Sequence, residues 1–307
     1  MTLLTRTFLS GSVARRSARC VEVICVGLAA GLVLVGICVL VGGCGSAAEP
    51  PSGGPADPRP RVVSLSPAMT TTLLDLAPEA RLVGRTPWCR GADSATVVGT
   101  LEGVDAELLV QIRPDVVLVQ PPAAGVDPVI LRLRDRLGFR LIAHRLDGLA
   151  DVRATVDALV AAAVVESTAS ETWSASVGEP PADGMTTGRR ILLLHGLEPF
   201  RAVGTDTYLD ETIESSGAVN ALQRPGWIEL GVEAIVSLEP DVVVVIGDPP
   251  DAASILGAVP WRRAPIVLGF EHPDVFEPST RIPLVNAAFR ALLRAHPATV
   301  PPAESES

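Results

Sequence analysis

Three histidines and one cysteine are the side chains best suited to chemistry, and they form no known catalytic or metal-binding motif. His144, His195 and His272 each follow an apolar run, which places each near the end of an expected strand. A zinc or haem-iron site needs such side chains to converge, but no short spacing such as H-x-x-x-H joins them. Cys89 has no evident partner to activate it as a nucleophile. We therefore predict no catalytic residues, no metal ligands and no cofactor, and the sequence leaves open whether a histidine touches a ligand.

The charged residues exclude further classes of function. All 25 basic residues are arginines, so the chain has no P-loop lysine, no Schiff-base lysine and no S-x-x-K nucleophile. The motifs G-x-S-x-G, H-E-x-x-H and C-x-x-C are also absent. The formal net charge is −10, whereas binding to nucleic-acid phosphates requires a basic face. We predict that the protein is not an enzyme and does not bind nucleic acid.

The first 43 residues have the pattern of an export signal. Arginines at positions 6, 15, 16 and 19 precede a nearly pure apolar run over residues 23–43. Small residues then lead to Cys44, an arrangement that resembles a bacterial lipobox, in which the cysteine is lipidated and becomes the new N-terminus. The apolar run has 21 residues, enough for an uncleaved transmembrane anchor instead. Both alternatives place the body of the protein outside the cytoplasm and tether it to a membrane.

A repeat divides the body of the chain into two similar halves. Residues 107–119 and 233–245 share a glutamate, apolar residues at helical spacing, a Pro-Asp pair and an apolar strand, at an offset of 126. Pro114 and Pro240 end the two helices, because the residue before a proline avoids the α-helical region. The β-branched runs that follow are typical of parallel strands buried on both faces.

The remaining segments complete a two-lobed α/β fold. Residues 149–177 are rich in Ala and Val and contain neither Pro nor Gly, which predicts one long helix. We predict two Rossmann-like lobes with mostly parallel sheets, joined by this single helix, with a ligand cleft between them. The predicted parts are a signal peptide at 1–43, a lipidated flexible tether at 44–60, the N-terminal lobe at 61–147, the connecting helix at 148–178, a loop at 179–188, the C-terminal lobe at 189–297 and a disordered tail at 298–307.

Several motifs resemble one class of binding proteins. They are Arg61-Val-Val-Ser-Leu-Ser-Pro-Ala, Leu82-Val-Gly-Arg-Thr-Pro-Trp-Cys89 and the two Pro-Asp repeats. Together they resemble the cobalamin and iron-siderophore class of periplasmic binding proteins, above all its vitamin B12-binding branch, over nearly all of residues 61–295. The resemblance implies a monomer that captures a corrinoid, haem or ferric-siderophore chelate and delivers it to an ABC permease in the cytoplasmic membrane.

The resemblance also implies ligand-binding residues. Trp88 and Trp227 fall where the B12-binding proteins carry cleft aromatics, and flat rings suit the face of a corrin or porphyrin. Arg201 falls in a loop where family members often have an aromatic residue, and a cleft arginine would pair with a carboxylate of the ligand. Leu101 replaces a tryptophan of the B12-binding protein, and this departure leaves the identity of the chelate open.

Glu107 and Glu233 match the glutamates that, in this family, meet arginines of the permease. Read without the resemblance, a glutamate in the first turn of a helix compensates the helix dipole. Two other functions remain open for the same fold. One is a metal-chelate sensor or carrier that serves a membrane partner without transport, and the other is a chelatase-like enzyme.

Overall fold

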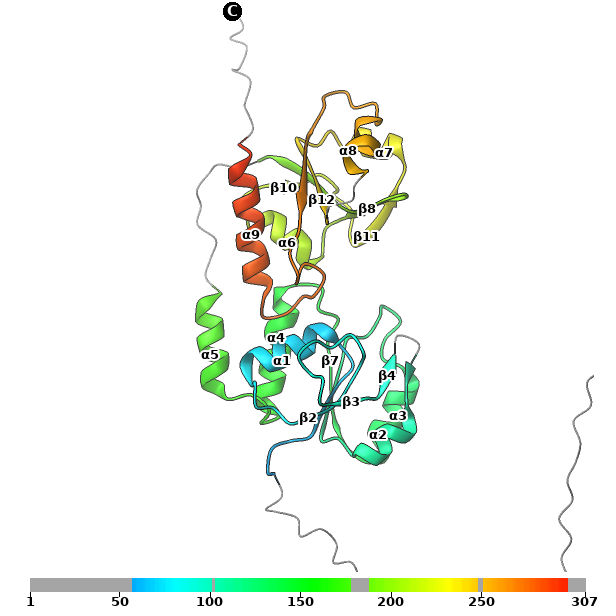
Figure 1. Cartoon of the computed structure of the whole chain (residues 1–307), viewed down its shortest axis with the longest axis vertical. Coiled ribbons are helices and arrows are strands. Elements are labelled where there is room, and N and C mark those ends of the chain that lie inside the picture. Colours follow the sequence, from blue (N-terminus) through cyan, green and yellow to red (C-terminus); the bar gives the residue numbers. More distant parts are fainter. Residues whose placement is uncertain (1–56, 101–102, 178–187, 248–250, 298–307) are drawn as a thin grey trace, which may run out of the picture. The chain divides into compact units, whose positions relative to one another are not determined.

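The computed structural model describes residues 57–100, 103–177, 188–247 and 251–297. The predicted signal peptide, Cys44, Leu101, residues 178–187 and the predicted tail lie outside these ranges. The described residues form two lobes, each built around one β-sheet with helices against it (Figure 1), which confirms the predicted α/β fold. Among these residues, none of the helices is both long enough and apolar enough to traverse a bilayer.

The first lobe contains a fully parallel sheet. Its five strands lie in the order β3-β2-β1-β6-β7, and each parallel pair needs a crossover connection. The strands are β1 (Val62–Ser64), β2 (Leu82–Arg85), β3 (Thr96–Val97), β6 (Val116–Val119) and β7 (Arg140–Ala143), with a separate antiparallel pair of β4 (Gly99–Thr100) and β5 (Gly103–Val104). The helices are α1 (Pro67–Leu76), α2 (Ala106–Ile112) and α3 (Pro128–Leu137).

Part of the predicted tether is attached to this lobe. The guanidinium of Arg59 donates a hydrogen bond to the carbonyl of Glu79, and Arg81 donates one to the carbonyl of Asp57 at 3.0 Å. Residues 57–60 therefore lie against the first lobe and are not part of a free tether.

The second lobe contains a mixed sheet. Strands β8, β10, β12 and β13 are parallel neighbours, whereas β9 pairs antiparallel with both β8 and β11, in the order β11-β9-β8-β12-β13 with β10 also beside β8. The strands are β8 (Arg190–Leu197), β9 (Phe200–Val203), β10 (Val219–Asn220), β11 (Trp227–Leu230), β12 (Val242–Ile246) and β13 (Ile266–Phe270). The helices are α6 (Tyr208–Glu214), α7 (Val232–Ser237), α8 (Ala252–Gly257) and α9 (Ile282–Ala295). The short turn after β8 reverses the chain into β9, and β11, which begins at Trp227, pairs with β9 at the edge of the sheet.

The predicted repeat has the same structure in both lobes. Helix α2 leads into β6, and α7 leads into β12. Arg113 and Glu239, the residues before the two prolines, have positive φ angles of 50° and 45°, a backbone conformation that cannot continue a helix. Each following strand pairs with the first strand of its lobe, β6 with β1 and β12 with β8. The repeat is therefore confirmed as a helix, a break and an inner strand.

Residues 149–177 form two helices in place of the single long helix expected over 148–178. They are α4 (Leu149–Ala161) and α5 (Ser167–Ser176), which contact each other and α1. The chain reverses at Ala163, whose φ is 54°, and the amides of Val164 and Val165 donate to the carbonyl of Leu159 at 3.0 and 3.4 Å. The reversal buries Val165 to 5% exposure, which offsets the cost of about 1–2 kcal/mol for a left-handed alanine.

One hydrophobic cluster joins the two lobes. Along β8, alternate residues point to opposite faces of the sheet, so that Ile191 and Leu193 enter this cluster while Leu192 and Leu194 enter another. We call the shared cluster the joining core. It contains Val62, Val116, Leu118 and Ile142 of the first sheet, Ile191, Leu193, Val242 and Val244 of the second, and Met69, Leu73, Trp173 and Phe289 of the helices. Two smaller clusters cover the other face of each sheet.

Candidate ligand-binding site

An exposed aromatic group lies on the second sheet. The ring of Trp227 stands edge-on to the ring of His195, with centroids 4.9 Å apart and planes at 87°. Tyr208 lies behind them, 6.1 Å from Trp227. Trp227 is 45% exposed, whereas Tyr208 is buried and donates its hydroxyl hydrogen bond to the carbonyl of Val275 at 3.0 Å. Burial raises the pKa of Tyr208 and holds its hydroxyl in the neutral form.

Strand pairing places Arg201 on the same face as these rings. Trp227 is directly opposite Val203, and Glu229 is opposite Arg201. Val203 belongs to the joining core, and residues two apart on a strand share a face. Trp227, Glu229 and Arg201 therefore share the face of the sheet that the joining core occupies. His195 reaches the same face, because its ring contacts that of Trp227.

Charge on this face is balanced between neighbouring strands. The guanidinium of Arg201 lies 3.4 Å from the carboxylate of Glu229, and both side chains are at least half exposed. An exposed pair of this kind contributes only about 0–1 kcal/mol, so an incoming anion can replace Glu229 at little cost. Burial, and secondarily the positive charge of Arg201, lower the pKa of His195 and favour its neutral ring.

Trp88 is displayed by a tight turn of the first lobe. The amide of Cys89 donates to the carbonyl of Thr86 at 3.2 Å, which closes a four-residue turn with proline in its second position. Cys89 is only 1% exposed, and its sulfur lies 3.2 Å from the hydroxyl of Thr86. The anchored cysteine leaves Trp88 at the tip of the turn, with 45% of its surface exposed. Cys89 is thus a buried anchor of this turn.

An arginine beside Trp88 connects this turn to the second lobe. Arg90 donates to Asp274 and to Glu277, each at 2.8 Å. These two carboxylates, Glu277 foremost, raise the pKa of Arg90. Asp274 is 5% exposed and also lies 3.5 Å from Arg281, so its buried charge is balanced from both lobes.

The sequence did not single out Phe276, which lies between these two carboxylates. Its ring is 54% exposed, and its centroid is 6.4 Å from that of His195. Phe276 sits in a loop that follows an apolar strand and contains Pro273 and Pro278. Trp88 occupies the same kind of position after β2, and this parallel is the sequence signal that would have identified Phe276.

The other two histidines predicted near strand ends each contact a neighbouring residue. His144 lies 2.8 Å from the hydroxyl of Thr155, and His272 accepts a hydrogen bond from the amide of Asp274 at 3.2 Å. The described residues contain no group of three or more His, Cys, Asp or Glu side chains able to hold a metal ion.

The two glutamates of the repeat occupy equivalent exposed positions. Glu107 is the second residue of α2, and Glu233 is the second residue of α7. Both side chains are exposed, one on each lobe. Negative charge in the first turn also favours the helix, so the helix dipole accounts for part of their placement.

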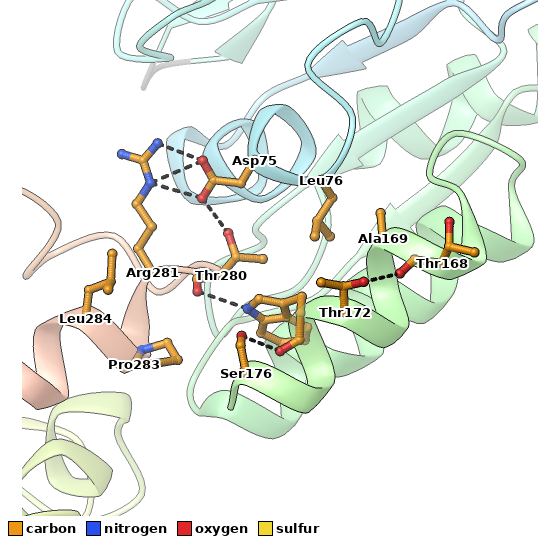
Figure 2. Close-up of a pocket in the computed structure, with 11 residues that line it drawn as sticks. Asp75, Leu76, Thr168, Ala169, Thr172, Ser176, Thr280, Arg281, Pro283 and Leu284 are labelled. Carbon is orange, nitrogen blue, oxygen red and sulfur yellow. Dashed lines mark hydrogen bonds and ion pairs between the residues drawn. The ribbon is translucent and has the colours of Figure 1, made fainter. Parts of the chain in front are cut away.

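A groove elsewhere in the molecule contains none of the predicted ligand residues. It has a volume of about 750 Å³ and lies between α1, α5 and the start of α9. Figure 2 shows that its polar groups bind one another. Arg281 pairs with Asp75 at 2.7 Å, and the indole of Trp173 donates to the carbonyl of Thr280 at 3.0 Å. These contacts tie α1 and α5 to the start of α9, so the polar residues of this groove serve to hold the helices together.

Solved structures share this fold, although their sequences differ widely. No model of a known protein family matches the chain, and no curated protein matches its sequence. The periplasmic heme-binding protein BhuT in complex with two hemes has 23% identity and a TM-score of 0.59, over 76% of this chain and 97% of BhuT. The vitamin B12-binding protein BtuF of Vibrio cholerae has 16% identity and a TM-score of 0.60, over 78% and 98%.

A heme-binding protein of Pseudomonas aeruginosa has 21% identity and a TM-score of 0.58, over 78% of this chain and 95% of its own. The shared architecture extends over nearly the whole length of each of these proteins. The chain therefore has the two-lobed fold of the heme, vitamin B12 and iron-siderophore class of periplasmic binding proteins.

Proposed function

We propose that this protein is the solute-binding component of an ABC importer and holds a bulky metal chelate between its two lobes. The observation that carries the proposal is the exposed ring of Trp227, which stands against His195 on the edge strand of the second sheet. Exposed aromatic rings are costly in water and provide a large, rigid contact area for a flat ligand. Solved proteins of this fold are described as binding heme or vitamin B12, which supports the same class of ligand.

Trp227 and Trp88 contribute ring faces from the two lobes, and Arg201 contributes a charge. A ligand carboxylate would take the place of Glu229 beside Arg201 and gain a charge-assisted hydrogen bond. The chelates that fit this combination are corrinoids, haem and ferric siderophores, with the carboxylates of haem the direct match for Arg201. The neutral form of His195 allows the site to accept an apolar macrocycle without burying a second positive charge.

Glu107 and Glu233 serve in this proposal as docking residues for the permease. Their matching, exposed positions on the two lobes suit recognition by two equivalent arginines of a dimeric partner. The protein acts as an exported monomer, tethered to the outer face of the cytoplasmic membrane by lipidated Cys44. The alternative anchor is an uncleaved helix over residues 23–43, and mass spectrometry of the mature protein distinguishes the two.

Two other functions are compatible with the fold and have less support. A sensor or carrier would bind the same chelate without transport, and chelate uptake by cells that carry the gene separates it from an importer. A chelatase-like enzyme would convert the chelate, and chromatography of the chelate after incubation with purified protein would reveal a product. We find no catalytic constellation among the described side chains and favour the importer.

The direct test is a thermal-shift panel of cyanocobalamin, cobinamide, hemin and a ferric hydroxamate siderophore. A ligand present at about 100 times its dissociation constant adds about 2.7 kcal/mol to the free energy of unfolding. At least one member of the panel should therefore raise the melting temperature by several degrees. A panel in which no compound shifts the melting temperature would refute the proposed ligand class.

A further inference from the structure

Phe276 is held in an exposed position by a rigid turn. The amides of Val275 and Glu277 donate to the carbonyls of His272 and Asp274 at 3.1 and 3.0 Å. Val275 and Asp274 are each 5% exposed, and the carbonyl of Val275 accepts the hydroxyl hydrogen bond of Tyr208. The neighbours of Phe276 are therefore anchored inward, while its own ring is 54% exposed. The turn therefore fixes a large apolar ring with more than half of its surface exposed to solvent.

Arg90 holds this turn from the opposite lobe. Its guanidinium binds Asp274 and Glu277, the residues two before and one after Phe276, each at 2.8 Å. A third contact reaches the carbonyl of Pro273 at 3.5 Å. Arg90 lies two residues after Trp88, so one side chain links the loop that displays Trp88 to the loop that displays Phe276. The hydroxyl of Thr71 adds a contact of the first lobe to Glu277 at 3.2 Å.

The exposed rings continue from Phe276 across the second sheet. The centroid of Phe276 is 6.4 Å from that of His195, and His195 is 4.9 Å from Trp227. We propose that Phe276 forms a third aromatic wall of the ligand site and that Arg90 is the positioning residue that holds this wall in place. This inference rests on the proposed function and narrows its ligand class to flat tetrapyrroles, because a line of rings offers contact area to a planar macrocycle.

Two probes test this role directly. Hemin and cyanocobalamin are titrated into the purified protein, and the quenching of tryptophan fluorescence gives the dissociation constant. Phe276→Ala should weaken binding of the tetrapyrrole that the wild-type protein binds by about tenfold, the effect of removing one well-packed aromatic contact. Leu284→Ala is the matched control, because Leu284 is another exposed apolar residue of the second lobe, at 60% exposure, and lines the separate groove of Figure 2. It should leave the affinity unchanged.

The positioning role of Arg90 is tested by a double-mutant cycle. Arg90→Gln should weaken binding in the same direction, and the double variant Arg90→Gln/Phe276→Ala should bind no more than about twofold more weakly than Phe276→Ala alone. Arg90→Lys keeps the positive charge and should bind the tetrapyrrole more tightly than Arg90→Gln does. Glu277→Gln removes the same ion pair from the second lobe and gives a second measurement if Arg90→Gln is too unstable to titrate. Additive effects of Arg90→Gln and Phe276→Ala would show a merely structural arginine and overturn the positioning role.

The outcomes separate this inference from the proposed function. If the wild-type protein binds a tetrapyrrole and Phe276→Ala binds it equally well, the third wall is refuted and the proposed function stands. If Phe276→Ala binds normally but loses chelate uptake in cells, Phe276 faces the permease and the inference is again refuted. If the wild-type protein binds neither probe but binds the ferric siderophore, the narrowing to tetrapyrroles is wrong. If it binds none of these compounds, the proposed function and the inference fail together.

Discussion

Asp241 makes in the second lobe the contact that Asp115 makes in the first. Each aspartate follows the proline of the repeat, and its carboxylate accepts a hydrogen bond from the backbone amide at the start of a strand. Asp115 accepts from Arg61 at 2.7 Å, and Asp241 accepts from Arg190 at 2.9 Å. The repeat in the sequence is thus a repeat of hydrogen bonds, which join the end of each helix to the neighbouring strand.

We expect Asp115→Ala and Asp241→Ala each to lower the free energy of unfolding by about 1 kcal/mol, the net value of a typical hydrogen bond. The two losses should add in the double variant, because the residues lie in different lobes and share no partner. Urea denaturation of the four proteins measures both quantities. Losses that differ by more than about 2 kcal/mol would contradict the equivalence of the two contacts.

Gly204→Ala should destabilise the protein by about 3 kcal/mol or more, or prevent folding. A Cβ atom at this position would overlap the backbone carbonyl of Arg224 and lie 2.9 Å from that of Gly226. The backbone at these residues is joined by hydrogen bonds, including Gly204 to Gly226 at 2.8 Å, and it leads directly into Trp227.

The matched control is Gly231→Ala, because nothing lies within 4 Å of a Cβ atom there. It should cost less than about 1 kcal/mol, the penalty for alanine at a helix N-cap. Circular dichroism during thermal unfolding compares the two variants, and equal losses would argue against the close backbone approach.

Trp88→Ala and Trp227→Ala should each weaken chelate binding by about tenfold or more, because buried aromatic anchors dominate binding energy. Trp88→Phe and Trp227→Phe keep a ring and should retain most of the affinity. Isothermal titration with the ligand identified by the thermal-shift panel measures all four variants. Unchanged affinity in both alanine variants would remove these residues from the ligand site.

Glu107→Gln/Glu233→Gln should abolish chelate uptake while the affinity for the chelate stays within about twofold of wild type. The change removes charge from the proposed docking positions and leaves the ring-lined face intact. Glu171→Gln, at an exposed position of α5, is the control and should transport normally. Uptake that survives the double change would favour the carrier or sensor over the importer.

Stability should depend on the protonation of His195. The pKa of His195 is lowered from 6.5 by burial and by Arg201. Between the lowered value and 6.5, the unfolded chain binds more protons than the folded protein, so the free energy of unfolding rises with pH in this window. The stability that depends on a neutral His195 is fully present above about pH 6.5 and is lost as the pH falls below that value.

Urea denaturation between about pH 5 and pH 7 tests this dependence. The variant His195→Gln cannot titrate and should show a smaller increase in stability with pH than the wild-type protein. Arg201→Gln removes one of the two causes of the lowered pKa and should also reduce the increase in stability with pH. An identical pH dependence in His195→Gln and wild type would show that other groups are responsible.

The sequence was sufficient to predict the lobes because the repeat is encoded by local rules. Two prolines end two helices, and β-branched runs follow them into sheets buried on both faces. These features need only residues close in the sequence, which is why a pattern detects them.

The break at Ala163 and the role of Phe276 depend on contacts that are distant in the sequence. Neither Gly nor Pro marks the reversal between α4 and α5. The chain turns there because Val165 packs into a core that residues of both sheets form. Arg90, which holds the turn that carries Phe276, lies 186 residues before it in the chain. A search for periodic patterns cannot reveal such pairs, because their spacing follows no repeat.

The joining core has a consequence for how the molecule folds and unfolds. Because apolar side chains of both sheets share one interior, either half expressed alone would present that interior to water and aggregate. Heating should accordingly produce a single calorimetric transition. A gene divided at the link between the halves should yield folded, ligand-binding protein only when both pieces are synthesised together.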